Sequence, residues 1–225
     1  MASILVDEQC LIPDGIASLA DFRRWALSPA FPERGRIDWI GSRIEVDMSP
    51  EDIFMHGTLK TEIVGVLWTL AKDRAMHLFT GETRVSSVVG DVSAEPDVVA
   101  VFDAAFDAGH VQLVPSAAGK PDRFIELEGG PDLIVEIVSD SSVAKDTRRL
   151  PAAYHAAGVR EFWLVDARGA DVLFTIHRHE ADGFVATAPV DGFARSDVFN
   201  CGFAIRRSRN PHGRLIYDLL VRSGH

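Results

Sequence analysis

Two Pro-Asp pairs, each followed by a run of apolar and β-branched residues, constrain the fold of this chain more than any other feature. Pro96-Asp97 precedes Val-Val-Ala-Val-Phe, and Pro131-Asp132 precedes Leu-Ile-Val-Glu-Ile-Val. Apolar runs of this length predict strands that are buried on both faces. Glu136 interrupts the second run where the pattern requires another aliphatic residue. A buried, ionised carboxylate costs several kcal/mol unless a partner compensates it.

A cation is the usual partner of such a carboxylate. Because side chains alternate between the faces of a strand, Glu136 shares a face with Asp132. If the two strands pair antiparallel, Asp97 at the start of one lies close to Glu136 near the end of the other. Carboxylate oxygens bind hard divalent cations at roughly 2.0–2.6 Å. We therefore predict that Asp97 and Glu136 hold a divalent metal ion; the alternative is a hydrogen-bonded pair without metal.

Length and composition are those of one soluble globular domain. The chain has 225 residues, of which 47% are hydrophobic and 25% are charged, and we expect a single domain over residues 1–225. Within it we expect a flexible N-terminus at residues 1–14 and an insertion between core strands at residues 103–130. No signal-peptide or membrane-span pattern is present, and two cysteines support no disulfide framework. We expect a cytoplasmic protein without a membrane partner.

The net charge of −10 limits how the chain can bind nucleic acid. Broad, sequence-independent coating of DNA is disfavoured, because neutralisation of phosphates dominates such binding. A local basic strip remains compatible with the overall charge, and solvated surface is the alternative interpretation of any such strip. The two candidate strips are Lys145, Arg148, Arg149 and Arg160, and Arg206, Arg207, Arg209 and Arg214.

The remaining patterns interleave helices and strands. Ser18-Leu-Ala-Asp21 starts a short helix, Ser49-Pro50-Glu51 starts the longest helix, and a third helix ends at Gly158. The alternation over Arg36–Met48 predicts a β-hairpin. Further strand patterns lie at residues 77–80, 84–89, 111–114, 124–127, 161–166, 172–176, 184–188, 199–205 and 215–221. The interleaving predicts an α/β fold with a mixed central β-sheet flanked by helices.

These residues are similar to those of the PD-(D/E)XK nuclease superfamily, and within it the chain resembles the bacterial Uma-type restriction endonucleases. The likeness runs from about residue 15 to about residue 220. It rests on Pro131-Asp-Leu-Ile-Val-Glu-Ile-Val-Ser139, Asp146, Tyr154, Ala157-Gly158-Val159 and Glu161-Phe-Trp-Leu-Val-Asp166, and upstream on Met48-Ser-Pro50, His56-Gly57 and Ala94-Glu-Pro-Asp97.

The resemblance implies a restriction-endonuclease-like core, with extra N-terminal and C-terminal β-hairpins. It also implies hydrolysis of phosphodiester bonds in DNA with Mg²⁺ or Mn²⁺ as cofactor, and a homodimer as the acting form. Asp97 and Glu136 would hold the metal. A nearby lysine would orient or activate the attacking water, and its charge would stabilise the transition state.

The chain departs from this family pattern at the lysine. Val138 stands at the third position of the E-x-K triplet, and Leu150 stands four residues after Asp146, where Uma-type members commonly carry a lysine. Lys145 is the first candidate for the missing cation and Arg149 is the second. Arginine is a poor general base because it stays protonated, although it can bind phosphate with two hydrogen bonds.

Proline at position 151 complicates the helix that carries these cations. Pro151 cannot lie deep in a helix that begins at Asp146, because it lacks an N–H group and its ring collides with the preceding turn. The helix therefore begins near Leu150, or its first turn is distorted.

Four other residues are weighed as functional candidates. His56 matches the family His-Gly pair and is a candidate site residue, with capping or packing as the alternative. Glu82 is a candidate accessory acid, although a loop carboxylate is the better interpretation. His177 and His179 share a strand face but lack a third ligand, which makes a weak zinc signal.

Three hypotheses for function remain. A metal-dependent endonuclease leads, and a catalytically degenerate relative that acts as a nucleic-acid-binding or assembly module is the main alternative. A hydrolase of another phosphorylated substrate is the third. A lysine or arginine head group that reaches the space between Asp97 and Glu136 would favour the enzyme.

Overall fold

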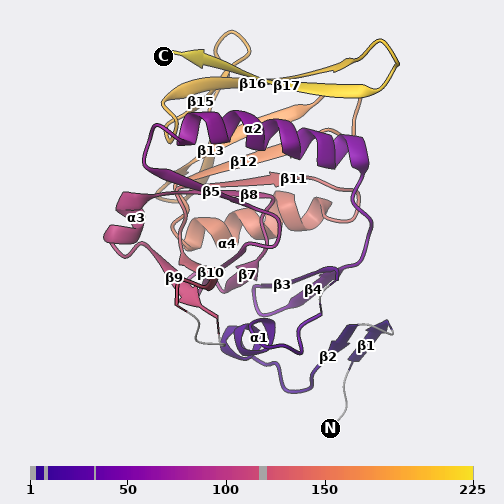
Figure 1. Ribbon diagram of the computed structural model, residues 1–225, viewed down its shortest axis with the longest axis vertical. Coiled ribbons are helices and arrows are strands. Elements are labelled where there is room, and N and C mark those ends of the chain that lie inside the picture. Colours follow the sequence, from indigo (N-terminus) through magenta and orange to yellow (C-terminus); the bar gives the residue numbers. More distant parts are fainter. Residues whose placement is uncertain (1–3, 8–9, 33, 117–120, 225) are drawn as a thin grey trace.

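Two mixed six-stranded sheets with a helix between them form the body of the protein in this computed structural model, which describes residues 4–7, 10–32, 34–116 and 121–224 (Figure 1). The central sheet has the order β14 (Gly183–Ala186), β13 (Leu173–Glu180), β12 (Glu161–Asp166), β11 (Leu133–Ile137), β8 (Val98–Phe102) and β5 (Met76–Thr80). The second sheet has the order β4 (Ile44–Asp47), β3 (Arg36–Ile40), β7 (Val92–Ala94), β6 (Arg84–Ser87), β10 (Phe124–Gly129) and β9 (Val111–Pro115).

Each sheet combines parallel and antiparallel pairs. In the central sheet β11 runs parallel to β12 and antiparallel to β8, and in the second sheet β10 runs parallel to β6 and antiparallel to β9. The predicted α/β fold with a mixed central sheet is therefore confirmed. The sequence patterns indicated a hairpin at residues 36–48, but they did not indicate that this hairpin belongs to a second full sheet.

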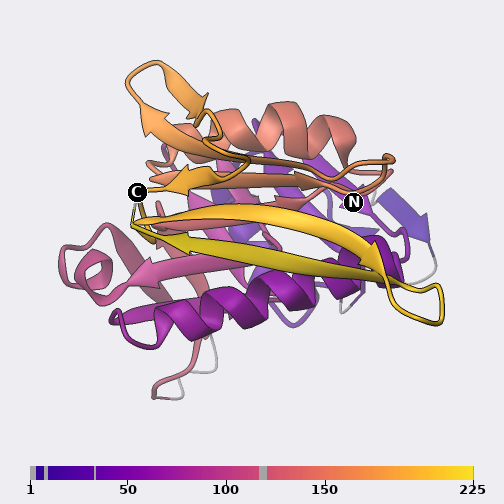
Figure 2. The ribbon, with the colours of Figure 1, turned by 90° about the horizontal axis from the view of Figure 1, so that it is seen from above.

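Strand β11 is buried on both faces, as its apolar run predicted. Leu133, Val135 and Ile137 face one core cluster, which α2 (Leu59–Ala71) and the strands β16 (Cys201–Arg209) and β17 (Leu215–Ser223) complete. Ile134 faces the opposite cluster, which includes α4 (Leu150–Ala156) and the inner face of the second sheet. Figure 1 shows α2 and the C-terminal strands on one side of the central sheet and α4 on the other, and the view from above in Figure 2 has the C-terminal strands in front.

Helix α4 packs very closely against the backbone that surrounds it. A Cβ atom at Gly90 would lie 2.5 Å from the carbonyl oxygen of Ala153, and one at Gly130 would lie 2.5 Å from the carbonyl oxygen of Ala157. Both contacts are shorter than real Cβ contacts, so only glycine fits at these two positions. The close packing holds the second half of α4 against the turn between β6 and β7 and against the segment that leads into β11.

Two wide, π-helical turns precede the main helices. The turn η1 (Ile53–Thr58) leads into α2, and Asp52 caps it by accepting hydrogen bonds from the backbone N–H groups of Phe54 (2.8 Å) and Met55 (2.5 Å). The turn η2 (Lys145–Arg149) leads into α4, in whose first turn Pro151 lies. The helical chain already runs from Val143, and Pro151 is accommodated because the turn directly before it is wide and π-helical. Of the two alternatives that the sequence left open, the structure has the distorted first turn.

Helix α1 (Leu19–Ala26) orients strand β3. Ser18 Oγ accepts a hydrogen bond from the backbone N–H of Asp21 at 3.2 Å and so caps the helix. A cluster built from α1 and β3 then buries Phe22 against Ile37 and Trp39. Because side chains alternate along a strand, Arg36 and Asp38 point to the opposite face of β3.

The insertion and the N-terminus contribute smaller elements. Residues 103–130 contain α3 (Asp103–Asp107), β9 and β10, and the two strands lie at the edge of the second sheet rather than beside β8 or β11. Of residues 1–14, β1 (Ile4–Asp7) and β2 (Cys10–Ile12) pair antiparallel, and residues 1–3 and 8–9 lie outside the described part. None of the described helices has the length and hydropathy needed to cross a membrane.

A buried glutamate joins the central sheet to the C-terminal strands. Glu161, at the start of β12, accepts hydrogen bonds from Trp163 Nε1 (2.7 Å) and Ser196 Oγ (2.6 Å). It also accepts from the backbone N–H groups of Asp197 (2.8 Å) and Val198 (3.3 Å), which follow β15 (Ala194–Ser196). These donors would lack partners if the carboxylate were removed.

The Glu161→Ala substitution should lower the free energy of unfolding by about 3 kcal/mol, since it leaves buried donors unsatisfied. The measurement is urea denaturation followed by circular dichroism. Glu180→Ala removes an exposed carboxylate that pairs with Arg178 and should change the stability by less than about 0.5 kcal/mol. Equal losses in the two variants would contradict the role assigned to Glu161.

Candidate active site

Asp97 and Glu136 meet at one end of the central sheet. Strands β8 and β11 pair antiparallel with Val99 opposite Ile134 and Val98 opposite Val135, which is the condition under which the sequence analysis expected Asp97 to lie close to Glu136. Asp97 directly precedes β8, and its Oδ2 accepts a hydrogen bond of 2.8 Å from the backbone N–H of Ile137. Strand alternation places both carboxylates on the α4 side of the sheet, since Val99 and Ile134 belong to the α4 cluster.

Asp97 is surrounded by positive charge. Its Oδ1 accepts from Arg36 Nη2 at 2.8 Å and from Lys60 Nζ at 3.2 Å, and its Oδ2 lies 3.2 Å from His56 Nε2. Burial alone would raise the pKa of this carboxyl. The hydrogen bond from His56 and the charge of Arg36 outweigh burial and hold the pKa of Asp97 well below its usual range. Asp97 is therefore a permanent anion in this fold.

His56 links two carboxylates through its two ring nitrogens. Nε2 faces Asp97 Oδ2, and Nδ1 contacts Glu51 Oε1. Ionised carboxylates only accept hydrogen bonds, so this geometry requires both nitrogens to donate, which is the imidazolium form. Burial opposes that form, but the hydrogen bond and charge of Asp97 raise the pKa of His56 above its ordinary value. The buried ring lies within η1, and π-helical turns are frequent at functional sites.

Glu136 and Asp146 have the opposite electrostatic environment. Burial, followed by the charges of Asp146 and Asp97, raises the pKa of Glu136 well above its usual range, and Tyr154 Oη donates to Glu136 Oε1 at 2.7 Å. Burial likewise raises the pKa of Asp146 to about 6. Ser142 donates to Asp146 Oδ2, whereas Asp146 Oδ1 is buried without a hydrogen-bond partner. The site thus crowds three carboxylates and leaves one of their oxygens without a hydrogen bond.

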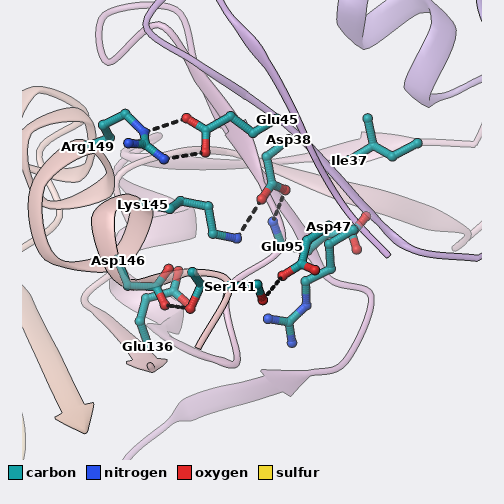
Figure 3. Close-up of polar contacts among 12 residues, drawn as sticks. Ile37, Asp38, Glu45, Asp47, Glu95, Glu136, Ser141, Lys145, Asp146 and Arg149 are labelled. Atoms are coloured by element: carbon teal, nitrogen blue, oxygen red, sulfur yellow. Dashed lines mark hydrogen bonds and ion pairs between the residues drawn. The ribbon is translucent and has the colours of Figure 1, made fainter. Parts of the chain in front are cut away.

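The two cations favoured from the sequence lie in different places. Lys145 Nζ points to Asp38 Oδ2 of β3 at 2.9 Å, beside Glu136 and Asp146 (Figure 3). Burial would lower the pKa of Lys145, but the neighbouring negative charges, first that of Asp38, raise it. Arg149 turns away and donates to Glu45 Oε2 of β4 at 2.7 Å (Figure 3). The structure therefore gathers Asp97, Glu136, His56 and Lys145, but it does not bring Arg149 to the carboxylates.

Two cavities open beside these groups. The larger, of about 770 Å³, is lined by His56, Lys60 and the loop after β11, and the smaller, of about 410 Å³, is lined by Asp38 and Lys145. Arg36 lines both cavities. The larger cavity also carries more carboxylates than cations, namely Asp47, Glu51, Asp52, Glu82, Glu95 and Asp140 against Arg36, Lys60, Arg168 and His56.

Four residues of the site were missed by the sequence analysis: Arg36, Asp38, Glu51 and Lys60. Two patterns could have pointed to them. Lys60 follows His56 by four residues, which places both on one face of a helix. Arg36 and Asp38 are separated by one residue, so they share a strand face. Neither pattern says which other element that face contacts.

The other candidates have structural partners. Asp132 accepts hydrogen bonds from the backbone N–H of Phe102 (2.8 Å) and from Arg160 (2.6 Å), so it ties the end of β8 to the start of β11. His177 and His179 each face a backbone carbonyl oxygen. Among the residues that the structure describes, no three His, Cys, Asp or Glu side chains form a ready-made metal cluster.

The candidate basic strips are partly neutralised. Arg206 pairs with Asp218 at 2.8 Å, and Arg207 donates to the carbonyl oxygens of Ala167 and Gly169. Arg149 pairs with Glu45, and Arg160 pairs with Asp132. These contacts leave few side chains of the two strips directed to a ligand.

The fold has a counterpart among solved structures. The structure is similar to a crystal structure, at 1.96 Å resolution, described as a "putative nuclease belonging to DUF820" from Anabaena variabilis ATCC 29413, with a TM-score of 0.56. The two share 20% sequence identity, over 81% of this chain and 90% of that chain, so this likeness concerns the fold.

The family match is more extensive. The model of the family described as "Uma2: Putative restriction endonuclease" matches residues 19–206, and the chain belongs to this family. The restriction-endonuclease-like fold and the family resemblance drawn from the sequence are thereby confirmed. No match was found among functionally curated proteins.

The opposite environments of Asp97 and Glu136 predict opposite effects of neutral substitutions on stability without metal. Asp97→Asn should lower the free energy of unfolding by about 3 kcal/mol, because buried cations lose their counter-charge. Glu136→Gln should leave it unchanged or raise it by up to about 1 kcal/mol, because it relieves carboxylate crowding.

Urea denaturation in the presence of EDTA measures the free energy of unfolding of both variants. The wild-type protein under the same conditions is the reference. A large loss of stability in Glu136→Gln would contradict the repulsion described above.

Proposed function

We propose that this protein is a metal-dependent endonuclease that hydrolyses phosphodiester bonds of DNA, with Asp97 and Glu136 as ligands of Mg²⁺ or Mn²⁺. The observation that carries the proposal is the pair of buried carboxylates on adjacent antiparallel strands, beside open cavities. Membership of the Uma2 family supports the same class of chemistry.

The side chains present fit a hard divalent cation. All the candidate ligands are carboxylate oxygens, which Mg²⁺ and Mn²⁺ prefer. Asp146 Oδ1 is buried and unpartnered, and mutual repulsion among the carboxylates would be relieved by a positive ion. Mg²⁺ commonly uses one or two carboxylates and completes its shell with water and substrate phosphate. A pair of protein ligands is therefore sufficient for this ion.

The cations around Asp97 would neutralise part of the negative charge of the substrate phosphate. A bound divalent ion supplies partial neutralisation of the phosphoryl oxygens and lowers the pKa of a nearby water. During hydrolysis the water oxygen bonds to phosphorus while the bond from phosphorus to the departing sugar oxygen breaks. The water loses its proton to solvent, and solvent returns a proton to the departing oxygen. Arg36 is suited to bind the phosphate through two hydrogen bonds.

Arg36 and Lys60 also favour the enzyme over the non-catalytic module. Both head groups lie within hydrogen-bonding distance of Asp97 Oδ1, at 2.8 Å and 3.2 Å. Both side chains also line the larger cavity, so a phosphate bound there could contact them beside the proposed metal ligand Asp97. Because carboxylates outnumber cations there, DNA binding should itself depend on the divalent ion.

Purified protein should cleave DNA when Mg²⁺ or Mn²⁺ is present and should lose this activity in EDTA. Glu136→Gln should lower the cleavage rate by at least about 100-fold, since it removes a ligand without unfolding the protein. End-labelled single-stranded and double-stranded oligonucleotides, with RNA in parallel, provide the assay. Mn²⁺ should also raise the melting temperature of the wild type more than that of Glu136→Gln.

Glu180→Gln is the matched control, because it makes the same change on the exposed part of β13. Its cleavage rate should equal that of the wild type. Metal-dependent binding of DNA without any cleavage would support the binding module instead. Cleavage that is indifferent to Glu136→Gln would refute the proposed metal site.

A further inference from the structure

The family pattern has its lysine at one of two positions, which Val138 and Leu150 occupy in this chain. Neither side chain carries a charge. Leu150 is 1% exposed and belongs to the core cluster of α4, so no cation could be accommodated there without burying its charge. Val138 ends the β11 run and lines the larger cavity with an apolar surface. Any catalytic cation must therefore come from another element of the fold.

Lys60 is the lysine that contacts Asp97. It lies in the first turn of α2, which covers the opposite face of the central sheet from α4, and it reaches the site at the end of the strands. Its Nζ lies 3.2 Å from Asp97 Oδ1 and 2.8 Å from Glu51 Oε1. The side chain lines the larger cavity, to which the loop after β11 also contributes.

Lys60 and Lys145 differ in how readily each can give up a carboxylate partner in order to bind a phosphate. Glu51, the second partner of Lys60, has a side chain that is 47% exposed, and an ion pair with such a group contributes little. The side chains of Lys145 and Asp38 are only 8% and 2% exposed. Separating that buried pair would leave an uncompensated charge, which costs several kcal/mol. Lys60 is thus the lysine that can exchange a protein partner for a phosphate.

We infer that Lys60 is the catalytic cation of this chain and that it takes the part of the lysine missing at positions 138 and 150. The inference rests on the proposed nuclease function. The ammonium group donates hydrogen bonds to the phosphoryl oxygens as negative charge develops on them, and it keeps its proton throughout. Arg36, which contacts the same carboxylate oxygen, acts beside it as a phosphate-binding residue.

The central variant is Lys60→Met, with Lys60→Gln as a shorter polar alternative and Lys60→Arg as the conservative replacement. Lys60→Met should lower the single-turnover cleavage rate by about 100- to 1,000-fold, and Lys60→Gln should lose a similar factor. Lys60→Arg should recover at least about tenfold of this loss, because it restores the positive charge. The affinity for an uncleaved oligonucleotide in Ca²⁺ should fall far less than the rate.

Lys72→Met is the matched control, since it makes the same change at the exposed end of the same helix. Its rate should remain that of the wild type. Melting temperatures with and without Mn²⁺ distinguish a catalytic role of Lys60 from a role in maintaining the metal site. The increase in melting temperature that Mn²⁺ causes should persist in Lys60→Met. Loss of this rise together with activity would overturn the inference, because Lys60 would then act by maintaining the metal site.

Two further outcomes separate this inference from the proposed function. If Lys60→Met and Lys60→Gln cleave within threefold of the wild type while Glu136→Gln is inactive, the assignment of Lys60 is wrong and the nuclease function stands. If the wild type shows no metal-dependent cleavage of DNA or RNA, both proposals fail. If only an Asp38→Asn, Lys145→Met double variant loses the rate, Lys145 is the catalytic cation.

Discussion

The buried charge of Asp97 is the interaction on which the arrangement of the site depends. A carboxylate in this position must be compensated, and its partners come from four separate elements. They are the backbone of β11, Arg36 of β3, His56 of η1 and Lys60 of α2. The second sheet, the central sheet and the longest helix are therefore joined at one ionised group. Folding of the protein and formation of the site are consequently coupled.

Glu136 and Asp146 contribute in the opposite direction. Their charges repel each other in a buried place, and burial adds to the cost of ionising either group. The hydrogen bond from Tyr154 compensates Glu136 only in part. Locally unfavourable groups of this kind are retained where function requires them, and the rest of the fold offsets their cost. The contrast with Asp97 divides the three carboxylates into one that its surroundings keep ionised and two whose ionisation the surroundings oppose.

The wide helical turns serve this arrangement. Turn η1 carries His56, and turn η2 carries Lys145 and Asp146, so both turns bring site residues to the same end of the central sheet. A π-helical turn displaces the side chains from their regular helical directions. In η2 this geometry also accommodates Pro151 directly downstream. Capping by Asp52 fixes the start of η1.

Local patterns in the sequence determined the strands β8 and β11, the α/β class, the family and the two central carboxylates. They could do so because an apolar run or a Pro-Asp pair involves only a few neighbouring residues. Only the tertiary structure decided the second sheet and the cations that meet Asp97. Arg36 and Lys60 are separated from Asp97 by 61 and 37 residues, and no local periodicity encodes such a meeting. It arises because α1 packs against one face of β3, so that Arg36 points from the other face, and because α2 begins beside the start of β8. Contacts between distant segments depend on how whole elements pack, and packing is a property of the folded chain alone.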